Sequence, residues 1–159
     1  MLRNEPQMTD ALDHFPLLHS LSAAQRAKVA SAAREVTFPA RHRIFDEGQP
    51  ARGCWLIRHG RVALDALVPG RGTIIVQTIG PGDVLGWSWL VPPRQWHFGA
   101  VTIDAVSAVE FDTTRLRALT DADPALGYPL VLGLFDAVLQ RLQNTRARLL
   151  DLYGSPRER

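Results

Sequence analysis

Residues 82–102 hold the side chains and the turn chemistry of this chain that are best suited to binding a small molecule. Gly82 and Gly86 allow a tight turn there, because glycine adopts backbone conformations that other residues resist. Backbone amides freed in such a turn form a concave site for an anion. Three of the four tryptophans lie in this segment and add large apolar faces to it. The candidate ligand-binding residues here are Val84, Leu85, Gly86, Trp87, Ser88, Arg94, Trp96 and His97.

Other chemistry finds little support in the sequence. No nucleophile elbow, zinc-protease helix or pair of carboxylates points to an enzyme. The histidines other than His97 have no partners at metal-ligand spacing, so no metal site is expected. The glycine-rich residues 69–72 lack a Lys-Ser/Thr pair and are typical of a hairpin tip rather than a phosphate loop. We therefore expect a binding protein that is not an enzyme and requires no cofactor.

Composition indicates one globular domain. The chain has 159 residues, 46% hydrophobic content and a formal charge of +2, with no arm of like charge that would capture DNA. Cys54 is the single cysteine, which excludes an intramolecular disulfide and is typical of a reducing compartment. There is no signal-peptide pattern and no uninterrupted apolar run of about 18 residues. These features predict a cytoplasmic protein without membrane contact or direct DNA binding.

The elements that must position residues 82–102 are strands. Ser22 and Gln25 have the spacing of a capping box and predict a helix that continues to about Arg34. Residues 35–112 then form short runs rich in Val, Ile, Thr and aromatic residues between Gly and Pro turns, which predicts an antiparallel barrel or sandwich. Val62, Leu64 and Ala66 alternate with Ala63, Asp65 and Leu67, and the apolar run Ile74, Ile75 and Val76 is predicted to lie deeper in the core.

A long helix is predicted from about Asp123 and Pro124, with Pro129 kinking its start. Its apolar residues recur at intervals of three and four, as in the a/d seam of a two-stranded coiled coil. The seam could instead pack on its own barrel, but a closed barrel needs no long helix to fill it, so self-association is favoured. The predicted dimer-interface residues are Phe135, Val138, Leu142, Thr145, Leu149 and Leu152.

Four motifs follow one another along the chain. Residues 44–51 hold a hydrophobic pair and a Glu-Gly turn, residues 55–62 an aromatic strand and a Gly hairpin, residues 82–86 the tight turn, and residues 141–145 the run Arg-Leu-Gln-Asn-Thr. In this order and spacing they resemble the cyclic-nucleotide-binding domain of the catabolite-activator (Crp/Fnr-like) type. The third motif is similar to the opening of that family's phosphate-binding cassette.

The resemblance covers most of the chain and implies a mainly β fold. The expected architecture is an antiparallel β-roll or jelly roll, a cupin-like double-stranded β-helix, with an N-terminal helix and a long C-terminal dimerisation helix. The fourth motif is similar to the part of that helix in which a family threonine reaches the purine base. The resemblance therefore implies that Thr145 serves both the ligand and the seam.

The pattern departs from the family inside the cassette. Typical members follow the second glycine with a Glu that bonds the ribose, and here that residue is Trp87. They also carry an Arg for the cyclic phosphate where this chain has Trp96, His97 and Phe98, and Arg94 is the nearest guanidinium in the sequence. Loss of a charged hydrogen bond worth about 1.5–3 kcal/mol weakens binding roughly ten- to hundredfold. Ordinary binding of cyclic AMP is therefore disfavoured.

Three alternatives stay open for this aromatic cassette. The rings could fill a vacated cavity, which would make the chain a ligand-free protein-interaction module. The amides of residues 85–87 could hold a nucleotide phosphate in an altered mode, with Arg94 or His97 as the cation. A non-nucleotide aromatic or apolar ligand, such as heme, could bind instead.

The expected organisation is a tail over residues 1–14, a helix and β-roll domain over 15–122, a dimerisation helix over 123–153 and a tail over 154–159. In transcription factors of this family a helix-turn-helix domain follows the dimerisation helix, and here the chain ends soon after it. The resemblance implies a stand-alone sensor or regulatory domain that forms a homodimer. It would act on an unknown protein partner and reposition its terminal helix when ligand binds.

Overall fold

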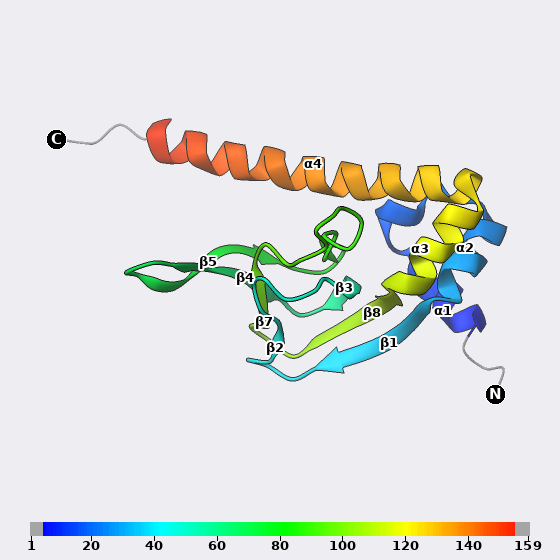
Figure 1. Cartoon of the computed structure of the whole chain (residues 1–159), viewed down its shortest axis with the longest axis horizontal. Coiled ribbons are helices and arrows are strands. Elements are labelled where there is room, and N and C mark those ends of the chain that lie inside the picture. The colour runs from blue at the N-terminus through cyan, green and yellow to red at the C-terminus, as the bar shows by residue number, and fades with distance from the viewer. Residues whose placement is uncertain (1–4, 155–159) are drawn as a thin grey trace.

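A computed structural model of the protein describes residues 5–154, and within them eight strands form two four-stranded antiparallel sheets (Figure 1). Three of the helices gather at one end of the sheets, and the fourth runs along the length of the molecule above them. The mainly β architecture with flanking helices is thus confirmed. The elements are α1 (Glu5–Asp13), η1 (Pro16–Leu18), α2 (Ala23–Ala30), β1 (Ala33–Phe38), β2 (Arg43–Phe45), β3 (Gly53–His59), β4 (Val62–Val68), β5 (Gly72–Ile79), β6 (Val84–Leu85), β7 (Gly99–Thr102), β8 (Val106–Asp112), α3 (Thr113–Ala122) and α4 (Pro124–Gly154).

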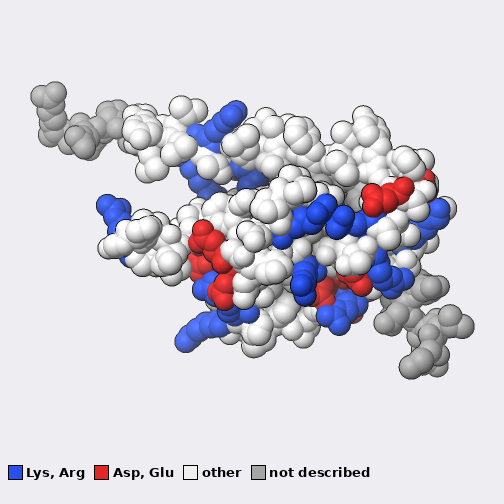
Figure 2. Space-filling model, viewed as in Figure 1, with Lys and Arg blue, Asp and Glu red and all other residues white. Residues whose placement is uncertain are grey.

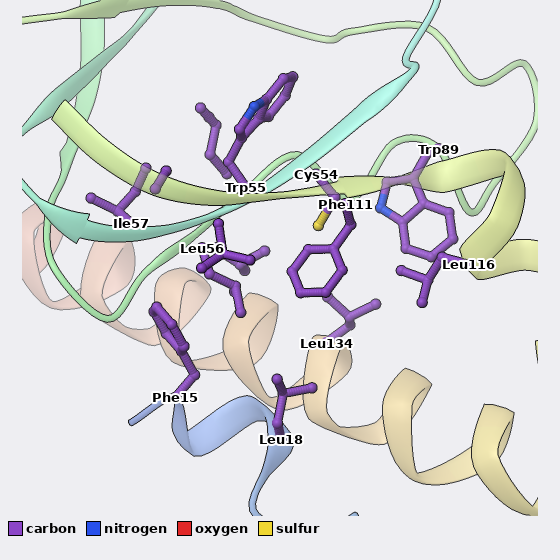
Figure 3. Packing of buried hydrophobic residues seen from close by; sticks show 14 of the residues in the cluster. Phe15, Leu18, Cys54, Trp55, Leu56, Ile57, Trp89, Phe111, Leu116 and Leu134 are labelled. Carbon is purple, nitrogen blue, oxygen red and sulfur yellow. The ribbon is translucent and has the colours of Figure 1, made fainter. Parts of the chain in front are cut away.

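The strands are ordered β1-β8-β3-β6 in one sheet and β2-β7-β4-β5 in the other. The core lies where the first sheet meets the helices: Leu56 of β3 and Phe111 of β8 face Leu134 of α4 and Leu18 of η1 (Figure 3). Cys54 of β3 is buried in this cluster, and burial raises the pKa of its thiol to about 12.

The N-terminal helices differ from the sequence expectation in extent. The capping box is present, since Ser22 accepts from the Gln25 amide and the Gln25 side chain accepts from the Ser22 amide, but α2 ends at Ala30. Arg34, expected in that helix, lies in β1, where the β-branched and aromatic residues that follow it favour a strand. Within the expected tail over residues 1–14, residues 5–13 form α1, which buries Met8 and Leu12 one turn apart. Residues 1–4 and 155–159 lie outside the described part of the chain.

The hairpin of β4 and β5 corrects a prediction about the core. Ile74, Ile75 and Val76 are 36%, 62% and 48% exposed, so the prediction that this run lies deep in the core is wrong. The prediction assumed a strand covered on both faces. Instead, β5 is an edge strand that pairs only with β4, and Figure 1 shows the hairpin extending past the opposite sheet.

The predicted alternation along β4 also fails at its first half. Val62, Ala63, Leu64 and Asp65 are all buried. Asp65 tolerates burial because Arg43 binds it through two parallel hydrogen bonds of 2.8 Å each. The sequence pattern assigned Asp65 to the exposed face because it is charged, and the pattern does not show that Arg43 would neutralise it.

Helix α4 continues through Pro129, which lacks an amide hydrogen to donate to the carbonyl of Ala125. The Gln25 side-chain nitrogen of α2 donates to that carbonyl instead, at 2.9 Å. The helix buries Leu126, Leu130 and Leu134 on one face, and beyond Leu134 most of its side chains are exposed or half-buried.

Among the described helices, α4 is the one that is long and apolar enough to cross a membrane by length and composition alone. This is weak evidence, because the core helix of a soluble protein passes the same test. Part of its apolar character is explained by the face that packs on α3 and η1. The expectation that the chain makes no membrane contact stays a prediction.

Candidate functional site at the cassette turn

The cassette turn, residues 82–88, is fixed to the first sheet by backbone hydrogen bonds. The Gly82 amide donates to the carbonyl of Ile57 at 2.9 Å, and the Ile57 amide donates to the carbonyl of Asp83 at 3.0 Å. The Asp83 side chain accepts from the Gly80 amide at 2.9 Å, which closes the turn. The short strand β6 then pairs with β3. The turn predicted from the glycine spacing is therefore present and is bonded to the first sheet.

Gly86 ends β6 in a conformation that glycine favours. Its φ is +89°, in the left-handed region. A Cβ added there would lie 2.8 Å from the Trp96 ring and 2.9 Å from the carbonyl oxygen of Gly53. The backbone at Gly86 thus passes against an aromatic ring with no room for a side chain.

That ring fills the space beside the turn. Trp96 is 5% exposed and stacks on Phe45 of β2, with 3.9 Å between ring centroids and 14° between ring planes. Trp55 of β3 packs against both rings, with its centroid 5.8 Å from that of Phe45 and 6.1 Å from that of Trp96. The recess that remains has a volume of about 50 Å³, whereas small-molecule pockets usually hold about 300 Å³ or more. In this arrangement the recess does not hold a nucleotide.

Backbone pairing holds Trp96 in the recess. Its amide donates to the carbonyl of Gln49 at 2.9 Å, and its carbonyl accepts from the amide of Gly48 at 2.8 Å. The carbonyl of Arg94 accepts from Ala51 at 2.8 Å. Residues 94–96 therefore run beside residues 48–51, and these backbone hydrogen bonds hold Trp96 at the recess.

Arg141 of α4 is the cationic side chain that lines the recess. Its guanidinium carbon lies 4.4 Å from the centroid of the Trp87 ring, and its Nη2 donates to the carbonyl of Val84 at 2.7 Å. Partial burial lowers the pKa of Arg141, and the negative charge of Asp83 partly opposes this. The buried Nη1 has no hydrogen-bond partner among the described residues.

The structure gathers most, but not all, of the predicted ligand-binding residues around one recess. Val84 lies in β6 behind it, Arg94 is half-buried outside it, and Thr145 is exposed on α4, where its hydroxyl donates to the carbonyl of Arg141. The predicted residues that line the recess are Leu85, Gly86, Trp87, Ser88, Trp96 and His97; the others that line it are Phe45, Leu64, Phe98 and Arg141.

Arg141 escaped the sequence prediction of ligand-binding residues, although it opens the motif at residues 141–145. A helical signal could have found it, because it lies four residues after Ala137 and seven after Leu134, on the face that packs on the domain. Thr145, one turn further on, does not line the recess that Arg141 reaches.

A second, open cleft of about 310 Å³ lies between α4 and the β-roll, on the other side of Val84 and Arg141. Figure 2 shows basic side chains gathered beneath the distal half of α4, over this hollow. Arg141 and Arg148 line the cleft, together with Asp83 and Asp136. The basic and acidic side chains balance, so the cleft has no clear preference for an anion.

The predicted dimer seam faces solvent rather than the chain's own β-roll. Phe135 is 62% exposed and Leu152 is 77% exposed, which excludes intramolecular packing as the reason for their apolar character. Leu142 and Leu149 are about half exposed, Thr145 is exposed and Val138 is half-buried. Thus α4 carries two apolar faces, one covered and one uncovered.

Comparison with known proteins identifies the fold and its relatives. A family model described as "Cyclic nucleotide-binding domain" matches residues 35–123. A CRP-like cAMP-activated global transcriptional regulator of Mycobacterium tuberculosis is 26% identical over 91% of this chain, which spans 63% of the regulator. The chain thus spans less than two thirds of the length of this curated relative.

Two solved structures share the fold. The structure of a cyclic nucleotide-binding domain from Methylobacillus flagellatus KT has a TM-score of 0.77 and 18% identity, with 92% of this chain and 82% of that one covered. The regulatory subunit of a cAMP-independent protein kinase A from Trypanosoma brucei has a TM-score of 0.69 and 15% identity, with 91% and 50% covered.

Proposed function

This chain belongs to the cyclic nucleotide-binding domain family. We propose that it is a regulatory domain that signals through the position of α4. We also propose that a second copy of the chain binds to the exposed face of that helix. The observation that carries the proposal is the pair of apolar faces on α4. One face joins the helix to the β-roll domain, and the other presents Phe135, Leu142 and Leu149 to a partner.

A second copy is the partner that fits this face. Apolar residues at intervals of three and four over residues 135–152 match the seam of a two-stranded coiled coil, which is self-complementary. Large exposed apolar side chains at this spacing are unusual for a face that stays in water. The dimer would place the two α4 helices together and couple the two β-roll domains.

Sedimentation of the purified protein tests this proposal. The wild-type chain is expected at twice the monomer mass, and Leu142→Glu, which places a charge in the seam, is expected to shift it to the monomer. Gln143→Glu adds the same charge to the next residue, which is polar and lies off the seam, and should leave the dimer intact. A wild-type monomer at high concentration, or dissociation of both variants alike, would contradict the proposal.

We also propose that the recess is filled by the chain's own aromatic rings and that the domain acts in its regulatory role without a bound ligand. Trp96 occupies the space beside the cassette turn, and Trp87 lies at the position where the family's typical pattern has Glu. The trypanosomal structure belongs to a kinase described as cAMP-independent, so a protein with this fold can be regulatory without cyclic AMP. This supports the interaction-module alternative. We propose a regulatory rather than a catalytic role, because Ser88 and His97 both line the recess but share no hydrogen bond that would activate the hydroxyl.

Ligand sensing is a second candidate, favoured by one observation. Gly82 and Gly86 of the cassette turn are both at positive φ, as in backbone turns that bind anions. A nucleotide would need Trp96 to leave the recess. Thermal unfolding against a panel of cyclic mono- and dinucleotides tests this, because a hundredfold excess over Kd adds about 2.7 kcal/mol to the unfolding free energy. Heme binding would instead give a coloured protein.

A further inference from the structure

The distal half of α4 has few anchors on the β-roll. Its buried residues end at Leu134, and the N-terminal half of the helix makes the contacts with α3 and η1. Beyond that point the open cleft separates α4 from β5. Arg141 is the residue through which this part of the helix reaches the cassette turn, by its bond to Val84 and its contact with Trp87.

The two contacts of Arg141 use different parts of one planar group. Nη2 meets the Val84 carbonyl in a hydrogen bond of 2.7 Å, which is short for a nitrogen donor and typical of a charged one. The face of the guanidinium lies over the Trp87 ring, and an indole offers the strongest cation–π attraction of the aromatic side chains. A lysine ammonium is also attracted to a ring, but it cannot stack its plane on the indole as the guanidinium does.

We propose that Arg141 and Trp87 form a clasp that holds the distal half of α4 on the cassette turn without a ligand. The residues act as positioning residues, since they set where the helix lies. The inference rests on the proposed function, in which the position of α4 is the output. Both halves of the clasp come from this chain, so the helix is docked by default, and any signal would act by opening it.

The clasp also explains why tryptophan suits position 87. The Trp87 side chain is half-buried, so its ring can cover the guanidinium on one face while its other atoms reach solvent. Asp83, on the same turn, adds a favourable charge to Arg141. The turn therefore offers the arginine a ring, a carbonyl and a nearby carboxylate within five residues of the chain, 83–87.

Pulsed electron–electron spin resonance on the full chain tests the clasp. Spin labels at Thr37→Cys in β1 and Arg146→Cys in α4 occupy exposed positions, one on the β-roll and the other on the distal half of α4. Labelled chains are mixed with excess unlabelled chain, so that the distance within one chain is measured whether or not a dimer forms. Cys54 is buried and its thiol has a raised pKa, so it is expected to stay unlabelled.

The wild-type chain, without ligand, is expected to give one narrow distance distribution. Loss of the charged hydrogen bond is expected to raise the undocked-to-docked ratio at least about tenfold, and loss of the cation–π contact about two- to thirtyfold. Arg141→Met and Trp87→Leu should both broaden the distribution, and the double variant should broaden it no further than the stronger single one. Arg148→Met is the matched control, because Arg148 lies on the same face two turns on and should leave the distribution narrow.

Conservative variants separate the clasp from a general loss of folding. Trp87→Phe keeps an aromatic face and should restore part of the narrow distribution that Trp87→Leu loses. A narrow distribution in Arg141→Met, or equal broadening in Arg148→Met, would overturn the clasp. Sedimentation measures the oligomeric state independently of the clasp. A monomeric chain that still gives the expected spin-label distances would refute the proposed dimer but not the clasp.

Discussion

The indole of Trp96 lies flat on the phenyl ring of Phe45, with 3.9 Å between their centroids. The two residues are far apart in sequence, and their contact joins the loop after the cassette to β2 of the second sheet. The ring of Trp55, from β3 of the first sheet, packs beside both of them. Aromatic packing thus links the two sheets at the place where the family's sequence pattern suggests a ligand pocket.

Trp96→Ala is expected to lower the free energy of unfolding by about 3–5 kcal/mol, because it removes a buried ring and leaves a cavity. Urea unfolding followed by circular dichroism measures this. Phe98→Ala is the matched control: Phe98 lines the same recess but is 41% exposed, so its loss should cost much less. Equal small losses in both variants would mean that Trp96 is not part of the core.

Gly86→Ala should destabilise the fold more than Gly82→Ala. Both glycines have φ near +88°, so each alanine carries backbone strain of about 1–2 kcal/mol. Only at Gly86 would the new Cβ meet the Trp96 ring and the Gly53 carbonyl, which adds about 1–3 kcal/mol of overpacking. The difference in unfolding free energy between the two variants, measured by thermal or urea unfolding, gives the cost of the contact between the new Cβ and the Trp96 ring and Gly53 carbonyl. Equal effects would show that Trp96 can move aside.

Arg43→Met is expected to cost about 3–5 kcal/mol, because it leaves the Asp65 carboxylate buried without its partner. Asp65→Ala should cost less, since Arg43 is 41% exposed at its side chain and can turn to water. The exposed pair of Arg61 and Asp104 provides the control, and Asp104→Asn should leave the unfolding transition unchanged. If Asp65→Ala lowered the free energy of unfolding more than Arg43→Met does, the result would argue against the cost of an unpaired buried carboxylate.

The buried thiol of Cys54 predicts a pH dependence. Its pKa is raised from 9.0 to about 12 by burial, so between these values the folded chain binds a proton that the unfolded chain releases. Its contribution is fully present below pH 9 and falls as the pH rises, by about 1.4 kcal/mol per unit. Urea unfolding at pH 8 and pH 10 should therefore show a larger loss in the wild type than in Cys54→Ala. The same loss in both would assign the effect to other groups.

Local sequence signals predicted those features that depend on neighbouring residues. The capping box at Ser22, the strand texture over residues 35–112 and the turn at Gly82 and Gly86 all appear in the structure. Each is decided by backbone preferences within a few residues. Helix α3 was missed as a separate element, although Asp112 caps it by accepting from the amides of Thr114 and Arg115.

Features that depend on distant residues were not predictable in the same way. The run at Ile74 has the composition of a core strand, and only the tertiary course of the hairpin exposes it. Arg141 looks like a flanking residue of a coiled coil until α4 is placed over the cassette turn. Trp96 could have been a pocket wall or a pocket filler, and the stacking on Phe45 decides its place.

The side chain of Gln25 serves two helices at once: its oxygen accepts from Ser22 at the start of α2, and its nitrogen donates to the Ala125 carbonyl that Pro129 leaves without a helical donor. The side-chain amide of Gln25 therefore connects the first turn of α2 to the first turn of α4. A rotation of α4 about its N-terminal end would break the bond between Gln25 Nε2 and the Ala125 carbonyl, whereas the capping bonds of α2 lie within residues 22–25. Helix α2 is thus bonded to the N-terminal end of α4, and Gln25→Glu, which keeps the acceptor and removes the donor, would loosen this connection while sparing the cap.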